Sequence, residues 1–91
     1  MNEREILAIF DREVLADRAH GHILLEQPRS AACLGRARMI LAQLGRAVLK
    51  EVCLPPRWLL VALEEGDVRD AVLVLGESGF TVLKGANSLQ R

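Results

Sequence analysis

Aromatic residues are scarce in this 91-residue chain, which contains one Trp, two Phe and no Tyr. None of these rings lies between the arginines of the basic stretch from Arg29 to Arg57, which argues against nucleic-acid binding by base stacking there. An excess of one charge is missing as well, because the formal net charge at pH 7 is zero. This balance argues against a general nucleic-acid coat protein and against a polybasic membrane binder.

Cysteine is rare and long apolar runs are missing. Cys33 and Cys53 lie 20 positions apart, a spacing that indicates reduced thiols rather than a disulfide framework. The longest unbroken apolar run, Trp58 to Leu63, has six residues, whereas a membrane-spanning helix needs about 20. The first residues carry charges of both signs and do not resemble a secretory signal. We therefore expect a cytoplasmic protein without a membrane partner.

Apolar and charged residues are present in the proportions of a folded domain. Hydrophobic residues make up 51% of the chain and charged residues 26%, which argues against disorder. The length fits one small domain that spans residues 1–91. We expect residues 87–91 to form a frayed tail.

Helical periodicity favours a mainly α, helix-rich single domain of about four helices. Asn2 and Glu5 fit a capping box, and an apolar stripe follows until a stop at Gly21. A second, longer amphipathic helix is predicted from Ser30 to Val52, with Gly45 on its polar margin. Its apolar arc consists of Cys33, Leu34, Ala37, Ile40, Leu41, Leu44, Val48 and Val52.

The remaining elements are an apolar run of open type, one helix and two short strands. The run Trp58 to Leu63 fits a buried strand or a short buried helix. A further helix is predicted to start at Asp67 and to stop at Gly79. Two short strands, near 22–26 and 80–84, complete this helix-rich interpretation.

A βαββαβ, ferredoxin-like α+β fold is the alternative. It would place strands at 21–27, 47–54, 57–64 and 80–85 and helices at 30–45 and 67–78. Composition favours the helical interpretation, because Leu and Ala dominate the apolar residues and Thr81 is the only Thr. The poor alternation of apolar and polar residues from Arg46 to Leu54 also argues against a strand there.

The zero net charge conceals an uneven distribution. Residues 27–57 carry six basic side chains and one acidic side chain, whereas both flanking segments are net negative. The candidate partner- or anion-binding residues are Arg29, Arg36, Arg46 and Lys50. We expect acidic groups of this chain or of a second copy to pair with them. A polyanion such as nucleic acid is the alternative partner.

The sequence contains no constellation that predicts catalysis or a cofactor. His20 and His22 lie two positions apart, and a metal site would need Asp17, Glu26 or Cys33 in addition. No nucleophile elbow or glycine-rich phosphate loop is present. We therefore predict neither catalytic nor metal-binding residues, no cofactor, and a protein that is not an enzyme.

High apolar content in so short a chain predicts a protein partner. A domain of this size has difficulty burying every apolar stripe, and an uncovered stripe commonly marks an interface. We expect an assembly subunit or small adaptor that forms a homo-oligomer, with Trp58, Leu59 and Leu60 as candidate interface residues. The alternatives are a nucleic-acid-binding regulator or, for a βαββαβ fold, a ligand-sensing regulatory domain with a small effector at a dimer interface.

Overall fold

The structure is a computed structural model that describes residues 2–27 and 35–88. Its elements in chain order are α1 (Glu3–Ala16), β1 (Gly21–Glu26), α2 (Arg36–Gln43), β2 (Val48–Leu54), β3 (Trp58–Leu63), α3 (Arg69–Glu77) and β4 (Thr81–Ala86). Among the described residues, no helix is both long and apolar enough to cross a membrane.

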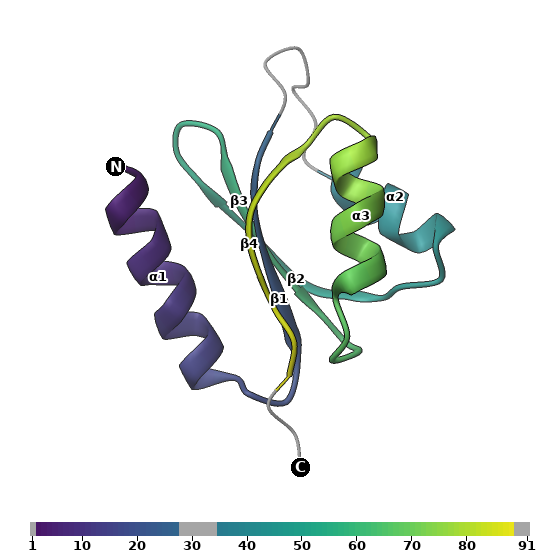
Figure 1. The fold of residues 1–91 in the computed structure, drawn as a ribbon, viewed down its shortest axis with the longest axis horizontal. Coiled ribbons are helices and arrows are strands. Elements are labelled where there is room, and N and C mark those ends of the chain that lie inside the picture. Colours follow the sequence, from purple (N-terminus) through teal and green to yellow (C-terminus); the bar gives the residue numbers. More distant parts are fainter. Residues whose placement is uncertain (1, 28–34, 89–91) are drawn as a thin grey trace.

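The four strands form one antiparallel sheet in the order β2-β3-β1-β4. Helix α2 connects β1 to β2 and helix α3 connects β3 to β4, so each pair of connected strands is separated in the sheet by a strand of the other pair. Figure 1 shows α2 and α3 on one side of the sheet and α1 alone on the other side. The fold therefore has three layers, with the sheet in the middle.

The mainly α prediction is wrong, and the α+β alternative describes the chain from β1 to β4. Its predicted strands agree with β1, β2, β3 and β4 to within one residue at each end, and Trp58 to Leu63 is a strand. The predicted N-terminal part of its first helix lies largely outside the described residues. The expected long helix up to Val52 does not exist, because α2 ends at Gln43.

Two local features explain why residues 44–54 resemble a helix in sequence. Gly45 has a φ of 83°, and it ends α2 in a Schellman motif in which Gly45 N donates to Ala42 O and Arg46 N donates to Leu41 O. A register shift then follows in β2 between Val48 and Lys50. Because a bulge breaks the alternation of faces, the strand loses its period-two signature.

Burial on both faces of the sheet explains why composition is misleading. Strand β1 buries Ile23 and Leu25 against the α2–α3 layer and Leu24 against α1. A strand that is covered on both faces needs a continuous apolar run rather than alternation, and Leu satisfies this need despite its helix propensity. The same holds for β3, where Leu59 and Leu60 are each 1% exposed.

The two faces of the sheet belong to separate apolar clusters. The larger cluster joins the sheet to α2 and α3, and its buried members are Ile23, Leu25, Ala37, Leu41, Leu59, Val61, Leu63, Val68, Ala71, Leu75 and Phe80. The smaller cluster joins the sheet to α1, and its buried members are Ile6, Phe10, Leu24 and Leu60. Most of the buried apolar surface therefore lies within the βαββαβ unit.

The predicted helix ends are confirmed in part. The capping box is present, because Glu5 N donates to Asn2 Oδ1 and Asn2 N donates to Glu5 Oε1, each at 2.9 Å. However, α1 ends at Ala16, and Gly21 is the first residue of β1 rather than a helix stop. Gly79, with a φ of 99°, follows the end of α3 as predicted.

Residues 87 and 88, which belong to the predicted frayed tail, form hydrogen bonds with the segment that leads into α3. Val68 N donates to Asn87 Oδ1 at 2.9 Å, and Ser88 N donates to Gly66 O at 2.8 Å. These bonds join residues 87 and 88 to the start of α3, and residues 89–91 lie outside the described part of the chain.

Candidate functional site

A pocket of about 320 Å³ lies between α3 and β4, and we refer to it as the β4-edge pocket. Its lining residues are Val68, Arg69, Val72, Gly85 and Asn87. Because β4 is the last strand in the sheet order, its outer edge carries no strand among the described residues. The pocket therefore opens beside a free sheet edge, and its volume is near the lower end of the range for small-molecule sites.

Glycine at position 85 preserves the space in this pocket. A Cβ atom at Gly85 would lie 3.1 Å from Val72 Cγ2 and 3.4 Å from Val68 Cγ2. Because a Cβ atom alone would lie at or below van der Waals distance from these valines, a larger side chain at position 85 would fill the gap between β4 and α3. The apolar floor of the pocket thus consists of two valines facing a bare backbone.

The polar rim of the pocket offers hydrogen-bond donors. Asn87 Oδ1 accepts the bond from Val68 N, so the amide group of Asn87 is oriented with its NH₂ free to donate. Arg69 donates from Nε and Nη2 to Asp67 Oδ1 and Oδ2 at 3.1 and 2.8 Å. This pairing, together with the bond from Arg69 N, lowers the pKa of Asp67 to about 2. Because the guanidinium side chain is 81% exposed, the ion pair is strongly screened and can exchange partners.

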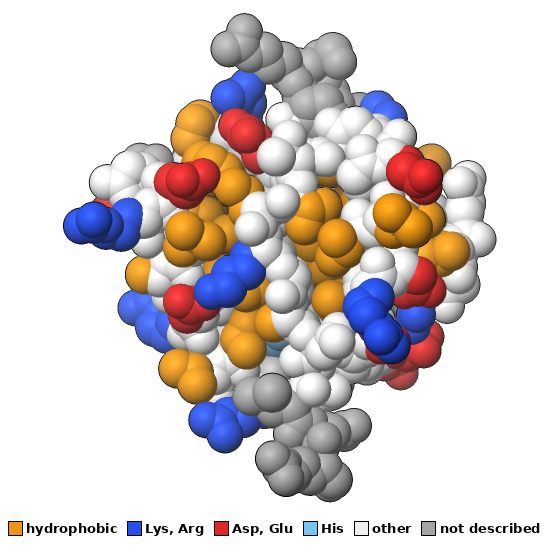
Figure 2. All heavy atoms as spheres, in the orientation of Figure 1, with side chains coloured by type: hydrophobic (Ala, Val, Ile, Leu, Met, Phe, Trp, Pro, Cys, Tyr) orange, Lys and Arg blue, Asp and Glu red, His pale blue; other side chains and the backbone are white. Residues whose placement is uncertain are grey.

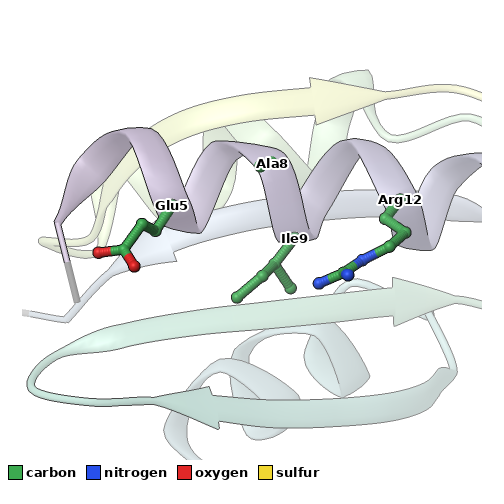
Figure 3. Close-up of a pocket in the computed structure, with 4 residues that line it drawn as sticks. All are labelled: Glu5, Ala8, Ile9 and Arg12. Carbon is green, nitrogen blue, oxygen red and sulfur yellow. The ribbon is translucent and has the colours of Figure 1, made fainter.

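A second pocket, of about 380 Å³, lies along α1 and is lined by Glu5, Ala8, Ile9 and Arg12. Figure 3 shows Ile9 and the Arg12 guanidinium on the side of α1 toward the β2–β3 hairpin, with Glu5 at the other end of the row. All lining residues belong to one helix, and Glu5 Oε1 already accepts the capping bond from Asn2. The β4-edge pocket differs from it, because two elements and the segment after β4 build its walls.

Those predicted basic residues that the structure describes, Arg36, Arg46 and Lys50, do not form one continuous site. Arg46 contacts Glu65 and Asp70, each at 2.7 Å, and Lys50 contacts Glu13 at 2.6 Å. Arg46 and Lys50 thus pair with the acidic flanks as expected.

Arg36 lies at the start of α2, where its Nη2 donates to Ser78 O at 3.2 Å. Arg29 lies outside the described residues. Within the described part of the chain, the candidate anion-binding side chains are thus directed to different neighbours: Arg46 to α3, Lys50 to α1, and Arg36 to the end of α3.

The candidate interface residues lie mostly inside the molecule. Leu59 belongs to the cluster under α2 and α3, and Leu60 belongs to the cluster under α1. Trp58 is half-buried and packs against the α1 cluster. Two of these three residues therefore offer no surface to a partner in this conformation.

The two histidines occupy different environments, because His20 lies between α1 and β1 and His22 lies in β1. His20 Nδ1 lies 2.8 and 2.9 Å from the two carboxylate oxygens of Asp17. His22 is 2% exposed, and its Nε2 lies 3.9 Å from Asp17 Oδ2. Within residues 2–27 and 35–88, no group of three or more His, Cys, Asp or Glu residues is placed to hold a metal ion.

The residues of the β4-edge pocket were not identified as a site from the sequence. The spacing of Val68, Ala71 and Leu75 predicts a helix, and Asn87 falls in the segment expected to be a tail. One sequence signal was available: Gly85 interrupts a strand, and such a glycine marks a bulge or a close approach of another element. Nothing in the sequence shows that α3 is the element that approaches.

Comparisons with known protein families, with characterised proteins and with solved structures found no significant match.

Proposed function

We propose that this protein is a small regulatory domain that senses an effector, and that the effector binds in the β4-edge pocket where two copies of the chain meet. The position of this pocket beside the free edge of β4 carries the proposal. A second copy placed along that edge would close the open side of the pocket. Effector binding and self-association would then be coupled.

The lining of the pocket supports an effector that combines a carboxylate with a short apolar group. The Arg69 guanidinium and the Asn87 amide supply donors for a carboxylate. Val68 and Val72 supply an apolar wall. The carboxylate of Asp67, now paired with Arg69, is available for an ammonium group if Arg69 turns to the effector. An amino acid with a small apolar side chain has all three features.

Exposed apolar surface along the β4 edge supports a second copy as the partner. Figure 2 shows hydrophobic side chains on both sides of the central strand backbone, between it and the helices. Self-association through one shared patch is the commonest arrangement of homo-oligomers, and covering this surface would remove apolar area from water.

Two observations argue against a nucleic-acid-binding regulator. Arg46 and Lys50 are already paired with carboxylates of the chain. Four-stranded sheets that bind RNA do so with aromatic side chains on an open face. Here α1 covers the face of the sheet opposite α2 and α3 with Ile6 and Phe10.

A thermal-shift screen of single amino acids and nucleotides tests the proposal. A ligand at a hundredfold excess over its Kd stabilises the folded state by about 2.7 kcal/mol, and each kcal/mol raises the Tm of a domain of this size by about 4–8 °C. We therefore expect a small apolar amino acid at this excess to raise the Tm by about 11–22 °C. Light scattering should show a larger dimer fraction when the amino acid is bound.

Two pairs of matched variants test whether the thermal shift arises from binding in the β4-edge pocket. Val72→Phe fills the pocket and should abolish the shift, whereas Leu73→Phe changes the neighbouring exposed position on α3 and should preserve it. Arg69→Gln should weaken effector binding. Arg38→Gln removes an equal charge at an exposed position of α2 and should leave effector binding unchanged. A screen without any stabilising compound, or a hit that Val72→Phe leaves unchanged, would contradict the proposal.

A further inference from the structure

Helix α1 is attached to the rest of the molecule through its own apolar cluster. Only Ile6 and Phe10 of α1 are fully buried, and their buried partners are Leu24 and Leu60. The buried core that joins α2 and α3 to the sheet contains no residue of α1. Loss of α1 would therefore expose Leu24 and Leu60 but leave the larger cluster in place, as expected for a local unfolding unit.

His22 is buried in this attachment. It lies on β1 beside Ala62 of β3 and Ala86 of β4, and its ring meets Phe10 of α1 edge-on, at 6.4 Å between centroids and 88° between planes. The imidazole is 2% exposed, and its Nδ1 is buried without a hydrogen-bond partner. A charged imidazole in this position would lack the solvation that it has in water.

The charged groups around His22 do not offset this cost. Asp17, after the end of α1, has both carboxylate oxygens within hydrogen-bond distance of His20, and Glu13 of α1 pairs with Lys50 of β2. On β4, Lys84 pairs with Asp11. The neighbouring strand β3 places Trp58, Leu60 and Ala62, none of which is ionisable, on the same face as His22. Burial outweighs the opposing effects of Asp17, Glu13 and the backbone of His20, so the pKa of His22 is lowered from 6.5.

We propose that α1 is held on the sheet by a pH-sensitive latch, in which the helix stays docked while the buried imidazole of His22 is neutral and is released as that imidazole gains a proton. When α1 leaves the sheet, His22 reaches water and recovers its ordinary affinity for protons. Acid therefore favours the undocked state. The ratio of docked to undocked protein falls by up to about tenfold per pH unit below 6.5, until the docked form also binds a proton.

Hydrogen exchange of the full chain between pH 5 and pH 7.5, corrected for intrinsic rates, tests this latch. We expect the protection of α1 amides to fall with decreasing pH by up to about tenfold per unit, while the amides of α3 keep their protection. Trp58, which packs under α1, should show a red shift of its fluorescence over the same pH range as it becomes exposed to water.

Replacement of the imidazole separates the latch from other acid effects. His22→Leu should remove the pH dependence of α1 protection, and His20→Gln, at the more exposed histidine, should preserve it. An NMR titration of the wild-type imidazole gives a second measure if His22→Leu does not fold. Equal loss of protection in α1 and α3, persistence of the pH dependence in His22→Leu, or titration of docked His22 at or above pH 6.5 would overturn the proposal.

Discussion

At the scale of single residues, charged side chains join segments that are far apart in the chain. Arg46, which follows α2, contacts Glu65 after β3 and Asp70 in α3. Its side chain is only 14% exposed, so this contact is less screened than an ordinary surface ion pair. The basic middle of the chain thus contributes to the internal connections of the fold.

Arg46→Gln should reduce the acid sensitivity of the protein. Hydrogen bonds from Arg46 lower the pKa of Asp70 below 3.8, so the ionised carboxylate stabilises the folded state. That stabilisation is fully present above the unfolded pKa and is lost as the pH falls through the lower folded pKa. In Arg46→Gln we expect a lower free energy of unfolding at pH 7 and a smaller further decrease between pH 4 and pH 2.

Urea titrations at several pH values measure this effect, with Arg38→Gln as the charge-matched control. The Asp67–Arg69 pair remains intact in both variants, so some acid sensitivity should persist. The same pH dependence in Arg46→Gln and wild type would show that Asp70 gains nothing from Arg46.

At the scale of elements, helix ends decide where the fold changes from α to β. Gly45 allows the chain to leave α2 with a positive φ, and the chain then enters β2. Residues 44–47 therefore separate two elements whose apolar residues happen to continue one helical arc. A single backbone conformation, rather than side-chain polarity, ends α2.

Gly45→Ala should destabilise the protein by about 1–2 kcal/mol, because a Cβ atom is unfavourable in the left-handed region. Gly76→Ala is the matched control, since Gly76 lies within α3 and a Cβ atom there would have nothing within 4 Å. The control should stabilise the protein by about 0.5–1 kcal/mol through its better helix propensity. Urea unfolding followed by circular dichroism measures both changes in the free energy of unfolding. A higher free energy of unfolding in both variants would contradict the role of Gly45 in ending α2.

At the scale of the whole molecule, the three-layer arrangement makes the two sides of the sheet unequal. The α2–α3 side holds the larger buried cluster, and the α1 side holds the smaller one. The β4-edge pocket lies on the α2–α3 side, and His22 lies on the α1 side. Effector binding and α1 release can therefore be tested separately, and loss of one leaves the other measurable.

Phe10→Ala and Leu41→Ala should have different consequences for that reason. Leu41 belongs to the large cluster, so Leu41→Ala should lower the free energy of global unfolding by about 2–5 kcal/mol. Phe10→Ala should release α1 instead, and should cost less in global stability than the about 3–5 kcal/mol typical of a buried Phe. Hydrogen exchange should then show fast α1 amides and protected α3 amides. Equal deprotection of α1 and α3 in Phe10→Ala would show that both clusters unfold as one.

The sequence by itself determined the features that depend on neighbouring residues. The capping box of Asn2 and Glu5, the stop at Gly79 and the stripe of Ile6 and Phe10 follow from local hydrogen bonding and helical spacing. The excess of positive charge in the middle segment likewise predicted ion pairs with the acidic flanks. These features need no knowledge of which segments meet.

Tertiary structure decided the class of the fold and the place of the candidate site. Leu24 and Leu60 are strand residues because α1 covers a second face of the sheet, and the bulge in β2 hides its alternation. The β4-edge pocket exists because α3 lies against Gly85. The scarcity of aromatics and of typical strand formers therefore did not exclude a sheet, since burial on two faces outweighs local propensity.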